Sequence, residues 1–81
     1  MSFLDTIEKV EIYYEREYNV LIRGLKDYDW MKSEPRKYIW QLMSEFCDIA
    51  MFVQDLGVAF NDINPIYEDY YAKFQKLLLT F

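Results

Sequence analysis

Apolar residues recur every three or four positions through the first third of the chain. They are Phe3, Ile7, Val10, Tyr14, Tyr18, Leu21 and Leu25. This spacing places side chains on one face of an α-helix. Ser2 and Asp5 have the spacing of a capping box, and Gly24 is typical of a helix end. The pattern therefore predicts a first helix over residues 3–24.

A second apolar stripe occupies the middle of the chain. Its members are Ile39, Leu42, Phe46, Ile49, Val53 and Leu56. Ser33, Glu34 and Pro35 mark a helix start, because a proline in the first turn lacks only a hydrogen bond that the helix does not need there. Gly57 marks the end. We expect a helix over residues 34–56, joined to the first by a linker with several large side chains.

The last third of the chain repeats these signals. Asn64 followed by Pro65 has the same order of cap and proline, which predicts a helix start. The apolar stripe beyond this point consists of Tyr67, Tyr70, Phe74, Leu77 or Leu78, and Phe81. A third helix over residues 65–80 completes the chain. The fold class predicted is all-α, a three-helix bundle in which residues 1–81 form a single domain.

The predicted middle helix is apolar around most of its circumference. On a helical wheel its stripe is flanked by Met43 and Ala50, and then by Trp40, Cys47 and Met51. These residues widen the apolar arc to roughly 220°, which is more than two neighbouring helices readily cover. We refer to Trp40, Met43, Cys47 and Met51 as the surplus row.

Two explanations of the surplus row are open at this point. Either the linker, with Tyr28, Trp30 and Met31, or the segment 58–60 folds over it, or the row is an interface. Methionine is adaptable and tryptophan is a large amphipathic anchor, so both suit an interface. Antiparallel pairing of two copies through the middle helix would close with two-fold symmetry. We expect a homodimer, a complex with another protein, or both.

Composition and charge narrow the classes of function. The chain is 53% hydrophobic and 20% aromatic, which is too apolar for a disordered segment. Its net charge of −5 offers no basic surface to nucleic acid or to anionic lipid. No apolar run is long enough to span a bilayer, and the acidic start is unlike a signal peptide. We expect a cytoplasmic protein that binds neither nucleic acid nor membrane.

The chain contains no histidine and one cysteine, Cys47. This composition excludes an intramolecular disulfide, zinc sites, and catalysis by Ser–His or Cys–His pairs. Cys47 lies within the apolar arc and is expected to be a small buried side chain rather than a reactive thiol. The eight tyrosines mostly occupy stripe positions, which favours the core over base stacking. No cofactor is predicted.

Paired carboxylates are the remaining candidates for chemistry. The polar residues of the middle helix fall in one narrow arc, and they are Gln41, Ser44, Glu45, Asp48 and Asp55. Such an arc is typical of a face in contact with solvent. The spacing between Glu45 and Asp48 recurs between Glu8 and Glu11 on the first helix. Two such pairs on adjacent helices can also hold Mg²⁺ through their oxygen atoms.

The letters of these pairs resemble the signature of MazG-type all-α nucleotide pyrophosphohydrolases, an E-x-x-E on one helix and an E-x-x-D on a later one. "EKVE" carries Glu8 and Glu11, and "EFCD" carries Glu45 and Asp48. The "DLGV" and "YYAKF" that follow are also similar to that family. The resemblance implies Mg²⁺-dependent hydrolysis of a nucleoside triphosphate to a monophosphate and pyrophosphate, with these four residues as metal ligands.

The residues favour binding over catalysis. A small acidic helical protein with a surplus row is expected to be a non-catalytic protein–protein interaction module that forms homodimers. Small, Tyr-rich helical proteins without catalytic residues are common in viral and mobile-element genomes. By this analogy the protein is a regulator or inhibitor that binds a host protein in the host cytoplasm. The alternative is the Mg²⁺-dependent pyrophosphohydrolase.

Overall fold

The computed structural model describes residues 6–81, and every regular element in this range is helical. Three helices of 21 residues are α1 (Ile7–Asp27), α3 (Pro35–Asp55) and α4 (Phe60–Thr80). A single turn, α2 (Asp29–Lys32), connects α1 to α3. The prediction of an all-α protein is therefore confirmed.

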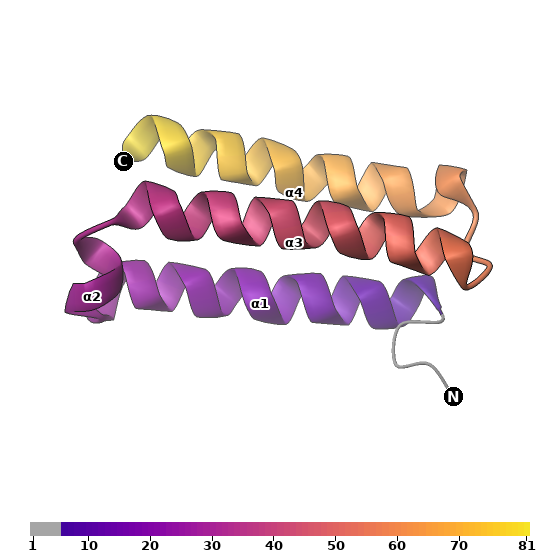
Figure 1. The fold of residues 1–81 in the computed structure, drawn as a ribbon, viewed down its shortest axis with the longest axis horizontal. Helices are drawn as coiled ribbons and strands as arrows, with labels where there is room; N and C mark the ends of the chain where they lie inside the picture. The colour runs from indigo at the N-terminus through magenta and orange to yellow at the C-terminus, as the bar shows by residue number, and fades with distance from the viewer. Residues whose placement is uncertain (1–5) are drawn as a thin grey trace.

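The three long helices lie side by side, with α3 between α1 and α4 when the molecule is viewed down its shortest axis (Figure 1). The Cα atoms extend over 39 × 24 × 15 Å, so the molecule is flattened. α3 packs against both outer helices, and α1 also contacts α4. α1 and α4 run in the same direction and α3 runs opposite to them (Figure 1). Every long helix therefore keeps part of its surface exposed.

The bounds of α1 differ from the predicted ones at both ends. Thr6 caps the helix, because its side chain accepts a hydrogen bond from the amide of Lys9 at 3.3 Å. The predicted capping box and Phe3 lie outside the described residues. Gly24 does not end the helix, which continues to Asp27. Packing explains the glycine at this position instead. A Cβ at Gly24 would lie 2.7 Å from Cε of Met31, so the absence of a side chain lets α2 fold back onto α1.

The predicted start of α4 is also wrong. The helix begins at Phe60, and Pro65 lies inside it. Asn64 does not cap the helix; its side-chain amide donates instead to Oε1 of Glu68 at 3.0 Å. The additional turn places Ile63 in the core, where it is completely buried. Burial of this side chain offsets the backbone hydrogen bond that proline removes.

The bounds of α3 match the prediction to within one residue. Pro35 occupies the first turn, and Gly57 follows the last turn with a φ of +104°. This conformation favours glycine because other side chains clash with their own backbone there. The amide of Val58 then bonds to the carbonyl oxygen of Val53 at 3.0 Å. Gly57 thus reverses the chain from α3 into α4.

An aromatic stack joins α1 to α3 at the centre of the molecule. The rings of Tyr14 and Phe46 lie 3.9 Å apart and nearly parallel, and both residues are completely buried. The Tyr14 hydroxyl donates to the carbonyl oxygen of Phe46 at 2.5 Å. From α4, Tyr70 and Phe74 present their edges to Phe46, with centroids 5.6 and 5.2 Å away. Aromatic rings thus link all three long helices.

Most of the predicted stripe positions are in the core. The buried apolar side chains of the described residues are Val10, Tyr14, Leu21, Leu25, Met31, Ile39, Met43, Phe46, Ala50, Val53, Ile63, Phe74 and Leu78. Leu56, expected to be the last stripe position of the middle helix, is exposed. The stripes therefore identify the packing faces of the helices, except near their ends.

We expect Tyr14→Phe to lower the free energy of unfolding by about 1–2 kcal/mol, because it removes a buried hydrogen bond while keeping the ring stack. Urea denaturation measures this as a lower midpoint with an unchanged slope. Tyr28→Phe is the matched control, since Tyr28 is exposed. Equal midpoints for the two variants would contradict the role of the Tyr14 hydroxyl.

Stability is expected to fall in alkaline solution. Burial raises the pKa of Tyr14, Tyr18, Tyr67 and Tyr70 above the usual 10.0. The unfolded chain loses these protons near pH 10, whereas the folded chain keeps them at higher pH. Their contribution to stability is therefore full below pH 10 and is lost as the pH rises through the folded pKa values. Urea denaturation at increasing pH measures this loss, and a constant free energy of unfolding would contradict it.

Candidate functional site

The surplus row divides between surface and core. Trp40 and Met51 are 52% and 63% exposed, and Cys47 between them is half-buried. Met43 is 5% exposed and belongs to the core. Trp40, Cys47 and Met51 thus form a line on the outside of α3, with Met43 beneath it.

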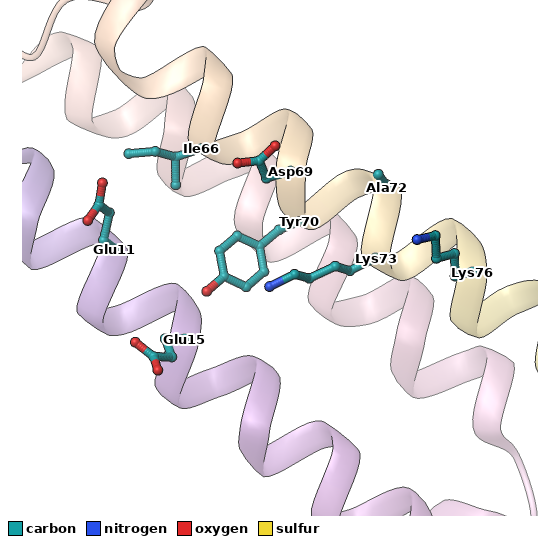
Figure 2. Close-up of a pocket in the computed structure, with 8 residues that line it drawn as sticks. All are labelled: Glu11, Glu15, Ile66, Asp69, Tyr70, Ala72, Lys73 and Lys76. Atoms are coloured by element: carbon teal, nitrogen blue, oxygen red, sulfur yellow. The ribbon is translucent and has the colours of Figure 1, made fainter.

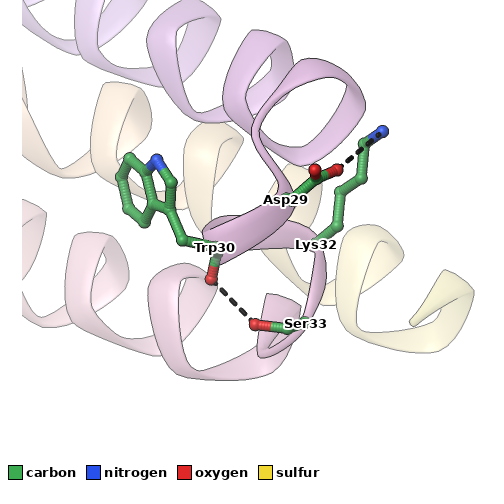
Figure 3. Close-up of polar contacts among 4 residues, drawn as sticks. All are labelled: Asp29, Trp30, Lys32 and Ser33. Carbon is green, nitrogen blue, oxygen red and sulfur yellow. Dashed lines mark hydrogen bonds and ion pairs between the residues drawn. The ribbon is translucent and has the colours of Figure 1, made fainter.

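The linker does not cover this line. Trp30 of α2 stacks on Tyr28 at 5.7 Å and meets the edge of Tyr38 at 5.3 Å. The carbonyl oxygen of Trp30 accepts a hydrogen bond from the Ser33 hydroxyl at 3.0 Å, which closes the turn (Figure 3). These contacts keep the linker at one end of the molecule. The segment 58–60 also leaves Trp40 and Met51 exposed.

A groove of about 310 Å³ runs between α3 and α4 beside Trp40. Its lining residues are Trp40, Met43, Ser44, Cys47, Tyr67 and Tyr71. The rings of Tyr67 and Tyr71 lie 6.1 Å apart, one turn from each other on α4. Tyr67 is a predicted core position, whereas the apolar stripe does not include Tyr71. Their spacing of four residues in "YEDYY" was the available signal.

We refer to Trp40, Cys47, Met51, Tyr67 and Tyr71 as the outer apolar face. Cys47 of α3 and Tyr67 of α4 line the same groove and interact across it, which places this part of α4 beside α3. Burial, and then the contact with Cys47, raises the pKa of Tyr67 above its usual value. The phenol therefore stays neutral near pH 7. The face thus presents uncharged aromatic and sulfur-containing side chains on both sides of a groove.

The polar arc of α3 is exposed to solvent along its length. Within it, Glu45 accepts a hydrogen bond from the hydroxyl of Tyr13 at 2.5 Å. This bond, with burial and the charge of Glu45, raises the pKa of Tyr13 to about 12. Glu45 therefore joins α3 to α1, a contact between residues 32 positions apart in the sequence.

A second depression, of about 460 Å³, lies between α1 and α4. Figure 2 shows Glu11 and Glu15 projecting into it from α1, and Asp69 and Lys73 from α4. The Lys73 ammonium lies 4.5 Å from the centroid of the Tyr70 ring. Carboxylates and ammonium groups thus share this depression, and the lysine is already held against an aromatic ring.

The acidic pairs that would bind Mg²⁺ in the alternative interpretation lie in different places. Glu11 belongs to the depression between α1 and α4, whereas Glu45 lies where α1 meets α3. Glu8 and Asp48 are exposed. Within residues 6–81, no three side chains of the Asp, Glu, Cys or His type gather closely enough to hold a metal ion. The structure therefore does not bring these four carboxylates together.

No protein-family model, curated protein or solved structure matches this chain. Within the described part of the chain, no helix combines the length and the apolar character needed to cross a membrane.

Replacing Glu45 tests the hydrogen bond that its carboxylate accepts from Tyr13. We expect Glu45→Ala to return the pKa of Tyr13 from about 12 towards 10.0, because the hydrogen bond and the nearby charge are both lost. An NMR titration of the Tyr13 ring measures the pKa directly. Asp48→Ala is the control and should leave this pKa unchanged. The same pKa in both variants would show that Tyr13 does not depend on Glu45.

Proposed function

We propose that this protein acts by binding a protein molecule through its outer apolar face, without catalysing a reaction. The observation that carries this proposal is the exposure of Trp40 and Met51 on α3, beside a groove whose far wall is formed by Tyr67 and Tyr71. Large side chains that stay uncovered in a small protein are typical of an interaction site.

The chemistry of the face suits protein recognition. A half-exposed tryptophan at the edge of a groove can anchor a partner, because it loses much apolar surface to water on binding. Methionine adapts its shape to the partner, and its sulfur packs well against aromatic rings. The groove exists before any partner binds, which reduces the entropy lost on association.

Charged residues border the face. Asp48 and Asp55 on α3 and Glu68 on α4 are all exposed. Charges at a border act on the rate of encounter and on the choice of partner more than on the affinity. Binding of this kind would block or bridge the partner's surface, as a regulator or inhibitor does.

The exposed apolar side chains of α1 do not form a comparable face. On α1, Ile12 and Val20 are exposed, and Arg16 lies between them on the same side of the helix. A charged side chain interrupts that row, and scattered apolar residues are normal on protein surfaces. The outer apolar face combines two helices and a groove.

Substitution at the face tests the proposal. Trp40→Ala and Met51→Asp are expected to weaken association by tenfold or more, in line with about 1.4 kcal/mol for each factor of ten. Ile12→Asp is the matched control, since Ile12 is 64% exposed and Met51 is 63% exposed. Sedimentation velocity measures self-association, and cross-linking in the source cell measures binding to other proteins. The proposal would be refuted if Trp40→Ala and Met51→Asp associated as strongly as the control and the unaltered protein in both assays.

A further inference from the structure

Four side chains on the outer side of α3 are arranged symmetrically about the centre of the helix. Trp40 and Met51 are equally distant from the point between residues 45 and 46, and Ser44 and Cys47 are equally distant from the same point. All four lie close together on the wheel of the helix. Along the helix, the two small side chains Ser44 and Cys47 thus lie between the two large ones, Trp40 at one end and Met51 at the other.

One pair of opposite charges on α3 has nearly the same centre. Lys37 and Asp55 are centred on residue 46 and share one border of the outer apolar face. Lys37 forms an exposed ion pair with Glu34 at 3.7 Å, and its ammonium lies 5.6 Å from the centroid of the Tyr38 ring. Contacts of this kind at the surface are weak enough to be exchanged for another partner. One end of the helix therefore offers a cation at the position where the other offers an anion.

α4 shares this centre of symmetry. Cys47 lies beside Tyr67, and the guanidinium of Arg36 donates to the carbonyl oxygen of Leu78 at 2.8 Å. These two contacts fix how the antiparallel helices are aligned along their length. The part of α4 beside the centre of α3 is then residues 68–69. Tyr67 and Tyr71 lie on the two sides of that point.

We propose that the occupant of the outer apolar face is a second copy of this chain, with each α3 antiparallel to the other and a two-fold axis near residue 46. This inference rests on the proposed function of the face and names its partner. In this arrangement Trp40 of one copy faces Met51 of the other, and Tyr67 faces Tyr71. Lys37 of each copy faces Asp55 of the other.

Two-fold symmetry requires a surface that is complementary to itself, and this face meets that requirement in its apolar residues and in the pairing of Lys37 with Asp55. A tryptophan ring against a methionine sulfur is a favourable contact. The ion pairs at the border select the antiparallel orientation, because a parallel pairing would place Lys37 against Lys37 and Asp55 against Asp55. An unrelated partner would gain nothing from this symmetry.

Cys47 provides a direct test because it is the one cysteine of the chain. In the proposed dimer the two Cys47 residues are displaced along the helix by about 4.5 Å, which allows a disulfide between the copies. Mild oxidation of the full chain should therefore give covalent dimers, seen by non-reducing electrophoresis. The same oxidation in urea measures collisions between unfolded chains and serves as the baseline.

Cysteines at other positions of α3 test whether the two α3 helices of the dimer are antiparallel. In the Cys47→Ser background, Ser44→Cys should also give covalent dimers, because residue 44 lies equally close to the axis. Asp55→Cys should give none above the baseline, since the two positions are about 28 Å apart along the helix. Efficient cross-linking at all three positions would show a parallel pairing and overturn the inference.

Charge reversal tests the border contacts independently. Lys37→Asp and Asp55→Lys should each weaken the dimer roughly fivefold in sedimentation equilibrium, and the double variant should recover most of that loss. Arg23→Asp on α1 is the control for a change of net charge. A double variant weaker than both single variants would contradict the pairing of Lys37 with Asp55.

The outcomes separate this inference from the proposed function. A protein that stays monomeric and gives no cross-link above the baseline overturns self-pairing. If Trp40→Ala then still abolishes binding to another protein, the proposed function of the face stands and only the partner is wrong. If no association of either kind depends on Trp40 or Met51, both proposals fail.

Discussion

The stack of Tyr14 on Phe46 is the contact on which the rest of the molecule depends. It holds α1 to α3 by ring packing and by the hydrogen bond from the Tyr14 hydroxyl to the backbone of α3. It also fixes the rotation of α3 about its own axis. With Phe46 turned inward, the helical period turns Trp40, Cys47 and Met51 away from α1 and towards the outside. The exposed face is therefore a consequence of the core.

Much of this fold could be predicted from the spacing of apolar residues. Ile39, Phe46 and Val53 lie on the predicted stripe, and all three are completely buried. The helix ends were less predictable, because their signals are local while the outcome depends on packing. Gly24 resembles a helix end in sequence, yet it makes room for Met31. Pro65 resembles a helix start, yet the burial of Ile63 extends α4 by a further turn.

The candidate site could be predicted only in part, for a similar reason. A helical wheel predicts a surplus of apolar residues on α3 but leaves open whether the linker or residues 58–60 cover them, and in the structure Trp40 and Met51 are exposed. The wheel of one helix does not reveal which residues of another helix lie beside it, so the contribution of Tyr71 was missed. The contact between Glu45 and Tyr13 was invisible for the same reason, since the two residues are distant in the sequence.

The turn at Gly57 determines how the two walls of the groove are aligned, which neither α3 nor α4 determines by itself. The short connection from α3 to α4 determines which residues of α4 lie beside which residues of α3, including Tyr67 beside Cys47. One additional residue in this turn would rotate or shift α4 by part of a helical turn. Both helices would still be amphipathic and the core could repack, but the walls of the groove would no longer face each other. The length of a four-residue connection is thus as much a part of the recognition surface as the side chains that line it.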